Sequence, residues 1–142
     1  MGHDDYNRIA EYEDEQIVTI QRNRNPIVLF YKQKRIIYVD FSDLKCADEI
    51  FIYAEKSSAL IRQNLPKSVL VLTNVSDMFF NRDVFFKMIG YMKKNDSYIK
   101  AYAVVGMSGI MLVFYNTLIR FSGRNLKPFV SETEAKEFLA SI

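Results

Sequence analysis

Short runs of apolar residues alternate along the chain with longer stretches whose apolar residues recur every three to four positions. The short runs are rich in β-branched and aromatic residues, which is typical of strands. They predict strands at 16–21, 27–31, 35–41, 68–75, 99–107 and 126–130. The polar KQK between the second and third runs predicts a hairpin with a tight turn. Pro128 places the last strand at an edge of the sheet, because proline cannot donate a ladder hydrogen bond.

The longer stretches predict four helices: 47–65, a helix that follows Asn81 and closes at KKNDS (93–97), 109–121 and 131–142. Asn81 and Ser108 are placed to cap the second and third helices, because their side chains accept hydrogen bonds from first-turn N–H groups. Pro66 ends the first helix. The sequence SETE at 131–134 is a capping box that begins the last one.

The order of these elements is a strand hairpin, then helix and strand in alternation, with a final helix. Such alternation predicts an α/β fold whose central sheet is mostly parallel. We therefore expect a mixed sheet with an N-terminal strand hairpin and about four helices. The length of 142 residues fits one domain. Residues 1–15 are predicted to be an acidic polar lead-in, and 16–142 a single domain.

Charge is distributed unevenly along the chain, although the net charge is only +2. The first sixteen residues carry six acidic side chains against Arg8, so the remainder is basic. A solvated acidic arm on a basic body explains this, and an arm folded over a basic face as a tether is the alternative. The aromatic residues fall within periodic core patterns rather than among Lys and Arg, so we expect no nucleic-acid partner.

Cellular location is predicted from cysteine usage and from the apolar runs. Cys46 is the single cysteine, which excludes an intramolecular disulfide and suits a reducing cytoplasm. No secretory signal is recognisable near the start. The apolar run at 110–119 is shorter than the about 20 residues that cross a bilayer. We expect a cytoplasmic protein without stable membrane insertion.

Four stretches are the most specific part of the chain: IIYVDFSDL (36–44), PKSVLVLTNV (66–75), KAYAVVGMSGI (100–110) and RFSGRN (120–125). With the order of elements, they make residues 27–142 resemble the SpoIIAA-like STAS family. These bacterial proteins are related to anti-sigma-factor antagonists and, more distantly, to CRAL-TRIO lipid-binding domains. The resemblance implies a STAS-like fold for 16–142 and a regulatory role in binding a protein partner.

In antagonist STAS domains, phosphorylation of a serine at the start of the helix after the second core strand breaks binding to a kinase. The matching loop here reads VSDMFFNRDVFF, in place of the Asp-Ser-Ser-Gly pattern of phosphorylatable members. Asn81 stands at about the acceptor position, and Ser76 is the nearest hydroxyl. The resemblance therefore implies the scaffold for this chain, and not the phosphorylation switch.

Several kinds of catalytic site are disfavoured by the residues present. His3 is the only histidine and lies in the lead-in, and one His with one Cys cannot form the usual zinc site. Asp40, Asp43 and Asp77 lie at or just past the carboxyl ends of predicted strands, at the edge where α/β sheets bind ligands. They are predicted either to cap turns or, in the less favoured alternative, to hold Mg²⁺. We expect no catalytic residue, metal or cofactor.

The two ends of the helix 109–121 are candidate contacts. Ser108 and Gly109 begin it, where backbone N–H groups can bind an anion or small residues can allow close packing. Ser122, Gly123 and Arg124 end it, where Gly123 suits a left-handed cap and Arg124 either complements the helix dipole or contacts a partner's carboxylate or phosphate.

The helix 109–121 is apolar on more sides than one sheet can cover. Met111, Phe114, Tyr115 and Leu118 share one face, and Leu112 and Ile119 lie away from it. A helix on a sheet needs only one apolar stripe. Leu112 and Ile119 therefore require another cover, which is the helix 131–142, a partner protein or second copy, or a lipophilic ligand or membrane surface.

From these observations we predict a non-catalytic regulatory or protein-interaction module that docks a partner or itself as a homodimer. Its surface would combine the helix 109–121 with the loops 76–81 and 122–125. The predicted site residues are Ser76, Asn81, Ser108, Gly109, Leu112, Ile119, Ser122, Gly123 and Arg124. One alternative is a carrier or sensor of a small apolar ligand or lipid held between helix and sheet. A carboxylate- or metal-dependent enzyme is a third.

Overall fold

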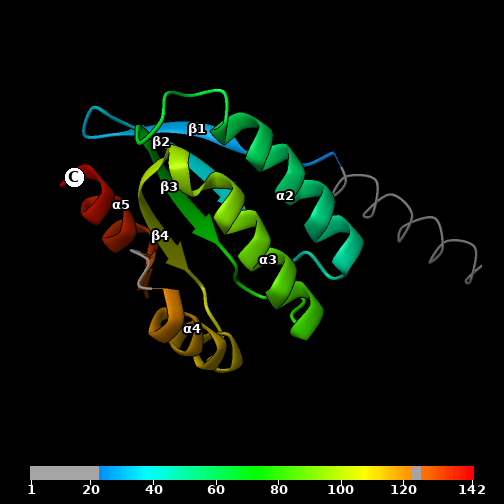
Figure 1. The fold of residues 1–142 in the computed structure, drawn as a ribbon. Coiled ribbons are helices and arrows are strands. Elements are labelled where there is room, and N and C mark those ends of the chain that lie inside the picture. The colour runs from blue at the N-terminus through cyan, green and yellow to red at the C-terminus, as the bar shows by residue number, and fades with distance from the viewer. Residues whose placement is uncertain (1–22, 123–125) are drawn as a thin grey trace, which may run out of the picture.

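The computed structural model describes residues 23–122 and 126–142, which form a five-stranded mixed sheet with four α-helices (Figure 1). The strands are β1 (Ile27–Tyr31), β2 (Lys34–Asp40), β3 (Val69–Asn74), β4 (Ile99–Val105) and β5 (Leu126–Phe129). The helices are α2 (Ala47–Ile61), α3 (Arg82–Asn95), α4 (Gly109–Ser122) and α5 (Glu132–Ala140), with a 3-10 turn η1 (Asp96–Tyr98) after α3. The predicted α/β class is confirmed. The lead-in 1–15 and the predicted strand 16–21 lie outside the described residues.

The strands lie in the sheet in chain order, from β1 at one edge to β5 at the other. β1 and β2 pair antiparallel, whereas β2, β3, β4 and β5 are parallel. The hairpin between β1 and β2 turns at Lys32 and Gln33, whose φ values of 48° and 67° are both left-handed. Two left-handed residues are what the tightest hairpins need to match the twist of their strands. The predicted hairpin and the predicted edge position of β5 are both confirmed.

The first predicted helix ends earlier than its periodicity suggested. The pattern predicted 47–65, but α2 ends at Ile61. The side-chain amide of Asn64 donates to the carbonyl oxygens of Leu60 and Ile61 at 2.9 and 3.2 Å. These bonds satisfy the last carbonyl groups of the helix, so the chain turns before Pro66 is reached.

Alternate strand residues face opposite sides of the sheet and form two separate cores. On one side, strand residues such as Ile37, Val71 and Val104 pack with residues of α2, α3 and α4. On the other side, Ile36, Leu70, Leu72, Ala101, Ala103 and Val105 pack with Ala135 and Leu139 of α5. Three helices therefore share one face, and α5 covers the opposite one (Figure 1).

The position of α5 decides one of the predicted alternatives. The helix 131–142 was a candidate cover for the outer residues of α4, but α5 lies on the far face of the sheet. It is held there by Ala135 and Leu139, and by Glu132, whose carboxylate accepts a hydrogen bond of 2.5 Å from the Tyr38 hydroxyl. That alternative is wrong, because the apolar stripe of α5 is already buried against other residues.

Candidate functional site

The carboxyl ends of β2 and β3 carry the same turn twice. The side chain of Asp40 accepts from the Ser42 N–H, and that of Asn74 accepts from the Ser76 N–H, both at 2.9 Å. The residue after each serine is an aspartate with positive φ, 62° at Asp43 and 56° at Asp77. Asp40 and its counterpart Asn74 therefore shape the turns. Within the described ranges, no three His, Cys, Asp or Glu side chains are close enough to hold a metal ion.

Gly106 brings the loop after β4 against the loop after β3. Its φ is +85°, and a Cβ atom there would lie 2.0 Å from the Ser76 Oγ and 2.7 Å from the Ser76 nitrogen. Only glycine fits at such a distance from backbone atoms. Ser76 is half-buried as a result. This close contact makes Gly106 a packing residue between the two loops.

Two predicted caps stand at the helix ends that border these loops. The Asn81 side chain accepts from the Val84 N–H at 2.8 Å and begins α3. The Ser108 hydroxyl accepts from the Met111 N–H at 3.3 Å, just before Gly109 begins α4. Both capping predictions are confirmed. Asn81, Ser108 and Gly109 are exposed, so they are accessible to solvent although they lie at the starts of the two helices.

The outer surface of α4 is apolar and exposed. Ile110, Leu112 and Val113 are 60%, 38% and 64% exposed, so the described part of the chain leaves much of their apolar surface uncovered. Leu112 is therefore not enclosed by another described helix, which leaves a partner protein, a second copy, a lipophilic ligand or a membrane surface as its predicted covers. The side chains of Ile119 and Ser122, together with Gly123 and Arg124, lie outside the described part of the structure.

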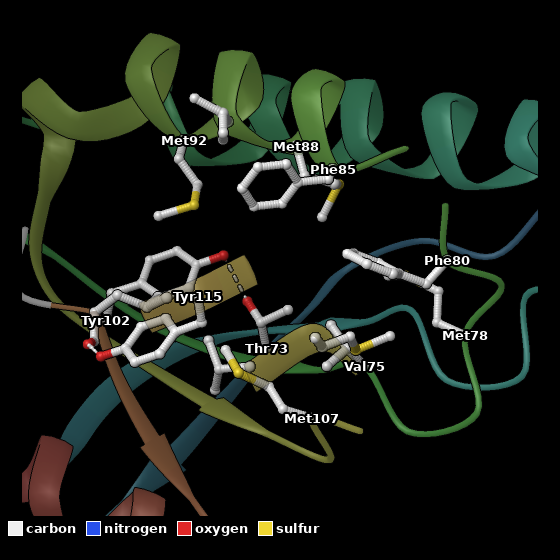
Figure 2. Close-up of a pocket in the computed structure, with 14 residues that line it drawn as sticks. Thr73, Val75, Met78, Phe80, Phe85, Met88, Met92, Tyr102, Met107 and Tyr115 are labelled. Atoms are coloured by element: carbon white, nitrogen blue, oxygen red, sulfur yellow. Dashed lines mark hydrogen bonds between the residues drawn. The ribbon is translucent and has the colours of Figure 1, made fainter. Parts of the chain in front are cut away.

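A pocket of about 90 Å³ lies between α3, α4 and the sheet (Figure 2). Its floor is buried and comes from the strands and the start of α4, whereas its walls are half-buried and come mainly from α3 and α4. The pocket is partly open to solvent. The lining residues are Thr73, Val75, Met78, Phe80, Phe85, Met88, Ile89, Met92, Tyr102, Val104, Met107, Met111, Tyr115 and Leu126.

Methionine is concentrated at this pocket. The chain has six methionines, and all five beyond Met1 line the pocket. In Figure 2, Met88 and Met92 point from α3 toward the sheet, and Met107 lies on the opposite side. Methionine is unbranched and polarisable, so it adapts its shape to different apolar neighbours. The pocket wall is therefore adjustable, unlike a core built from Ile, Val and Leu.

Phenylalanine rings lie at the side of the pocket near the loop after β3. The ring of Phe114 on α4 lies 5.3 Å from that of Phe80 and 4.7 Å from that of Phe85 on α3, between ring centroids. Aromatic pairs at such distances attract each other beyond their buried area. This cluster joins α3 to α4 across the loop, so the two pocket walls are linked at this end.

Three hydroxyl groups are the polar atoms of the pocket side chains. The Thr73 Oγ1 and the Tyr102 Oη share a hydrogen bond of 2.9 Å, drawn in Figure 2. The Tyr115 hydroxyl donates to the Leu126 carbonyl at 2.6 Å. Burial raises the pKa of Tyr102 to about 12, so its hydroxyl stays protonated at neutral pH. No lining side chain is charged.

The described residues that were predicted from the sequence lie in and beside the loops around this pocket, and not in its lining. None of the five predicted site residues that the structure describes, namely Ser76, Asn81, Ser108, Gly109 and Leu112, lines it. Each lies within three positions of a residue that does. The missed signal is the methionine set, because the apolar periodicity that predicts the helix after Asn81 does not distinguish a packed face from the wall of a pocket.

Comparisons of the chain with protein families, with curated proteins and with solved structures found no match. Within residues 23–122 and 126–142, no helix has both the length and the apolar character to cross a membrane. The class of protein is therefore inferred from the fold and from the pocket.

Proposed function

We propose that this protein is a non-catalytic binding module of the SpoIIAA-like type that carries or senses a small apolar molecule. The observation that carries the proposal is the uncharged pocket between α3, α4 and the sheet, with its five methionines. Apolar pockets with a few placed polar groups are the usual sites of small ligands. The resemblance over residues 27–142 supports a regulatory scaffold, and its distant CRAL-TRIO relation agrees with an apolar ligand.

The size of the pocket limits the ligand. An apolar cavity of about 150 Å³ in another protein holds benzene. The pocket here is smaller, about 90 Å³, so a six-membered ring fits only because the pocket is partly open and its methionine walls can adjust. Cyclohexanone and methylcyclohexane are suitable probes, because they share a six-membered ring and a single substituent atom.

A binding role also fits the acidic residues at the strand ends. Asp40 uses its carboxylate to hold the turn after β2. Lys45 donates to the carbonyl of Asp77 at 2.8 Å and so steadies the turn after β3. These contacts support a structural role for the aspartates, and we propose no reaction for them. A cytoplasmic location is part of the proposal and rests on Cys46, a free and exposed thiol.

Tryptophan substitutions test the pocket, because the chain has no tryptophan of its own. Met88→Trp replaces a lining residue with a larger side chain and is expected to weaken cyclohexanone binding at least tenfold. Phe86→Trp is the matched control on the same helix, since Phe86 is 54% exposed and does not line the pocket. It should bind as the wild type does. Titrations of the full chain, followed by single-tryptophan fluorescence and by thermal shift, measure both.

The proposed ligand site also predicts a change in the thermal stability of the wild-type protein. Saturating cyclohexanone or methylcyclohexane must raise its melting temperature, because a ligand that binds only the folded state stabilises it. If neither probe does so up to its solubility limit, and no apolar molecule is extracted from the purified protein, the proposal is wrong.

Docking of a protein partner, or of a second copy as a homodimer, is the second candidate function. It is favoured by the exposed Ile110, Leu112 and Val113 on α4. Contiguous exposed apolar residues are unusual on a monomer. Solution mass measured against concentration tests this function. Self-association that Leu112→Asp abolishes, with the fold retained, would support it, whereas a constant monomer mass would exclude the homodimer.

A further inference from the structure

The two hydroxyl groups at the floor of the pocket carry two protons, and only one of these protons is donated in the hydrogen bond between them. Thr73 and Tyr102 are 1% and 8% exposed, and each brings one O–H group. They share a single hydrogen bond of 2.9 Å. Whichever hydroxyl donates in that bond, the proton of the other remains. Among the described residues, the side-chain hydrogen bonds of these two hydroxyls are limited to this one, so one of the two protons has no acceptor in the described part of the protein.

The remaining proton belongs to a hydroxyl that lines the pocket. Thr73 lies on β3 and Tyr102 on the neighbouring β4, and both side chains belong to the pocket floor. The third hydroxyl, that of Tyr115, already donates to the Leu126 carbonyl. A buried polar hydrogen without a partner is unfavourable, and a ligand oxygen placed there removes that cost. The site thus offers one hydrogen bond in an otherwise apolar space.

Resting on the proposed function, we infer that the ligand is an uncharged apolar molecule with one hydrogen-bond-accepting oxygen, such as a ketone, an aldehyde or an ester. Its oxygen accepts from the Thr73–Tyr102 hydroxyl pair at the sheet. Its apolar body lies against the methionines of α3 and α4. An ionised carboxylate does not fit, because no cationic side chain lines the pocket and a buried charge needs a partner.

The test compares a ligand that has the oxygen with one that lacks it. The full chain is titrated with cyclohexanone and with methylcyclohexane, in the wild type and in a Thr73→Val, Tyr102→Phe double variant. The double variant removes both hydroxyls and keeps the shape of the floor. We expect it to weaken cyclohexanone about fivefold to tenfold, as the loss of one buried hydrogen bond does, and to leave methylcyclohexane within about twofold.

Tyr91→Phe is the matched control for the double variant. Tyr91 is a buried tyrosine whose hydroxyl has no partner among the described residues, and it does not line the pocket. Removing this hydroxyl makes the same chemical change outside the site. The ratio of the two probe affinities should therefore stay at its wild-type value.

The outcomes separate the inference from the proposed function. If both probes bind and the double variant leaves their affinity ratio unchanged, the inference is overturned and the apolar pocket stands. If neither probe binds the wild type, both fail. If the double variant does not fold, the inference is tested on the wild type alone. The quantity measured is then the infrared carbonyl stretch of bound cyclohexanone. It should lie below its frequency in hexane, and an unshifted stretch would overturn the inference.

Discussion

Helices α2 and α4 cover opposite ends of the same sheet face, and they cover it very differently. α2 buries seven residues, including Ile50, Tyr53 and Ile61, with almost no exposed area. In α4, Met111 is the one fully buried residue among the described side chains, and Ile110 and Val113 are largely exposed. Both helices connect parallel strands, so topology does not account for the difference.

The difference lies in which side chains meet the sheet. Under α2, Phe41 and Tyr53 pack edge to face with their ring centroids 5.0 Å apart, and leave the Tyr53 hydroxyl to accept from the Asp40 N–H at 2.6 Å. Under α4, methionines and half-buried aromatics leave a pocket. One end of the face is a fixed core, and the other end is an adjustable site. Stability and binding are therefore carried by different residues of one face.

The largest expected change in stability comes from truncating one side chain at the α2 end of this sheet face and one at the pocket end. Ile61→Ala removes a fully buried side chain of α2 and should lower the free energy of unfolding by about 2–5 kcal/mol. Met88→Ala removes a half-buried side chain beside existing space, so we expect about 1 kcal/mol. Urea unfolding of both variants measures the contrast. Equal losses would show that the pocket end is packed as tightly as the α2 end.

Stability at high pH depends on one buried tyrosine at each end of this sheet face, Tyr53 at the α2 end and Tyr102 at the pocket end. Burial raises the pKa of Tyr53 and of Tyr102 to about 12, above the unfolded value near 10. The stabilisation is therefore complete below pH 10 and is lost as the pH rises toward 12, on the order of 2 kcal/mol for Tyr102. Unfolding measured from pH 8 to 12 should show this decline.

Phenylalanine substitutions assign the high-pH decline to its source. Tyr53→Phe and Tyr102→Phe should each make the loss of stability above pH 10 smaller. A pocket freely filled with water would give a different result for Tyr102. In that case its hydroxyl would ionise at the ordinary pH in the folded protein, and Tyr102→Phe would decline as steeply as the wild type.

The helix caps should give the smallest effects. Asn81→Ala removes a 2.8 Å bond that begins α3 and should cost about 1 kcal/mol, or about 3 °C in melting temperature. Ser108→Ala removes a 3.3 Å bond at the start of α4 and should cost roughly half as much. A larger loss at Ser108 than at Asn81 would contradict the view that α4 is the less tightly held helix.

Much of the fold could be predicted from local signals. The apolar runs predicted the described strands, and Asn81, Ser108 and Ser131 marked the starts of their helices, because each cap depends only on neighbouring backbone groups. The end of α2 was missed, since the Asn64 amide closes the helix before Pro66. The face covered by α5 was also missed, because an apolar stripe does not specify which side of the sheet it meets.

The pocket could not be predicted from helical periodicity. Val84, Phe85, Met88, Ile89 and Met92 form one regular stripe, yet only Val84 is fully buried, and the other four line the pocket. Periodicity shows that a face is apolar, and not whether its partner fills the space. The choice of methionine over leucine along that stripe was the available sign, because methionine is favoured where packing must adapt.

Methyl NMR of the full chain, labelled at its methionine and isoleucine methyl groups, tests the central claim most directly. Titration with cyclohexanone should shift the signals of Met78, Met88, Met92, Met107 and Met111, which line the pocket, and leave that of Ile61 on α2 unchanged. If the methionine signals stay in place at the solubility limit of the probe, or if Ile61 moves as much as they do, then no distinct ligand site exists between α3 and α4.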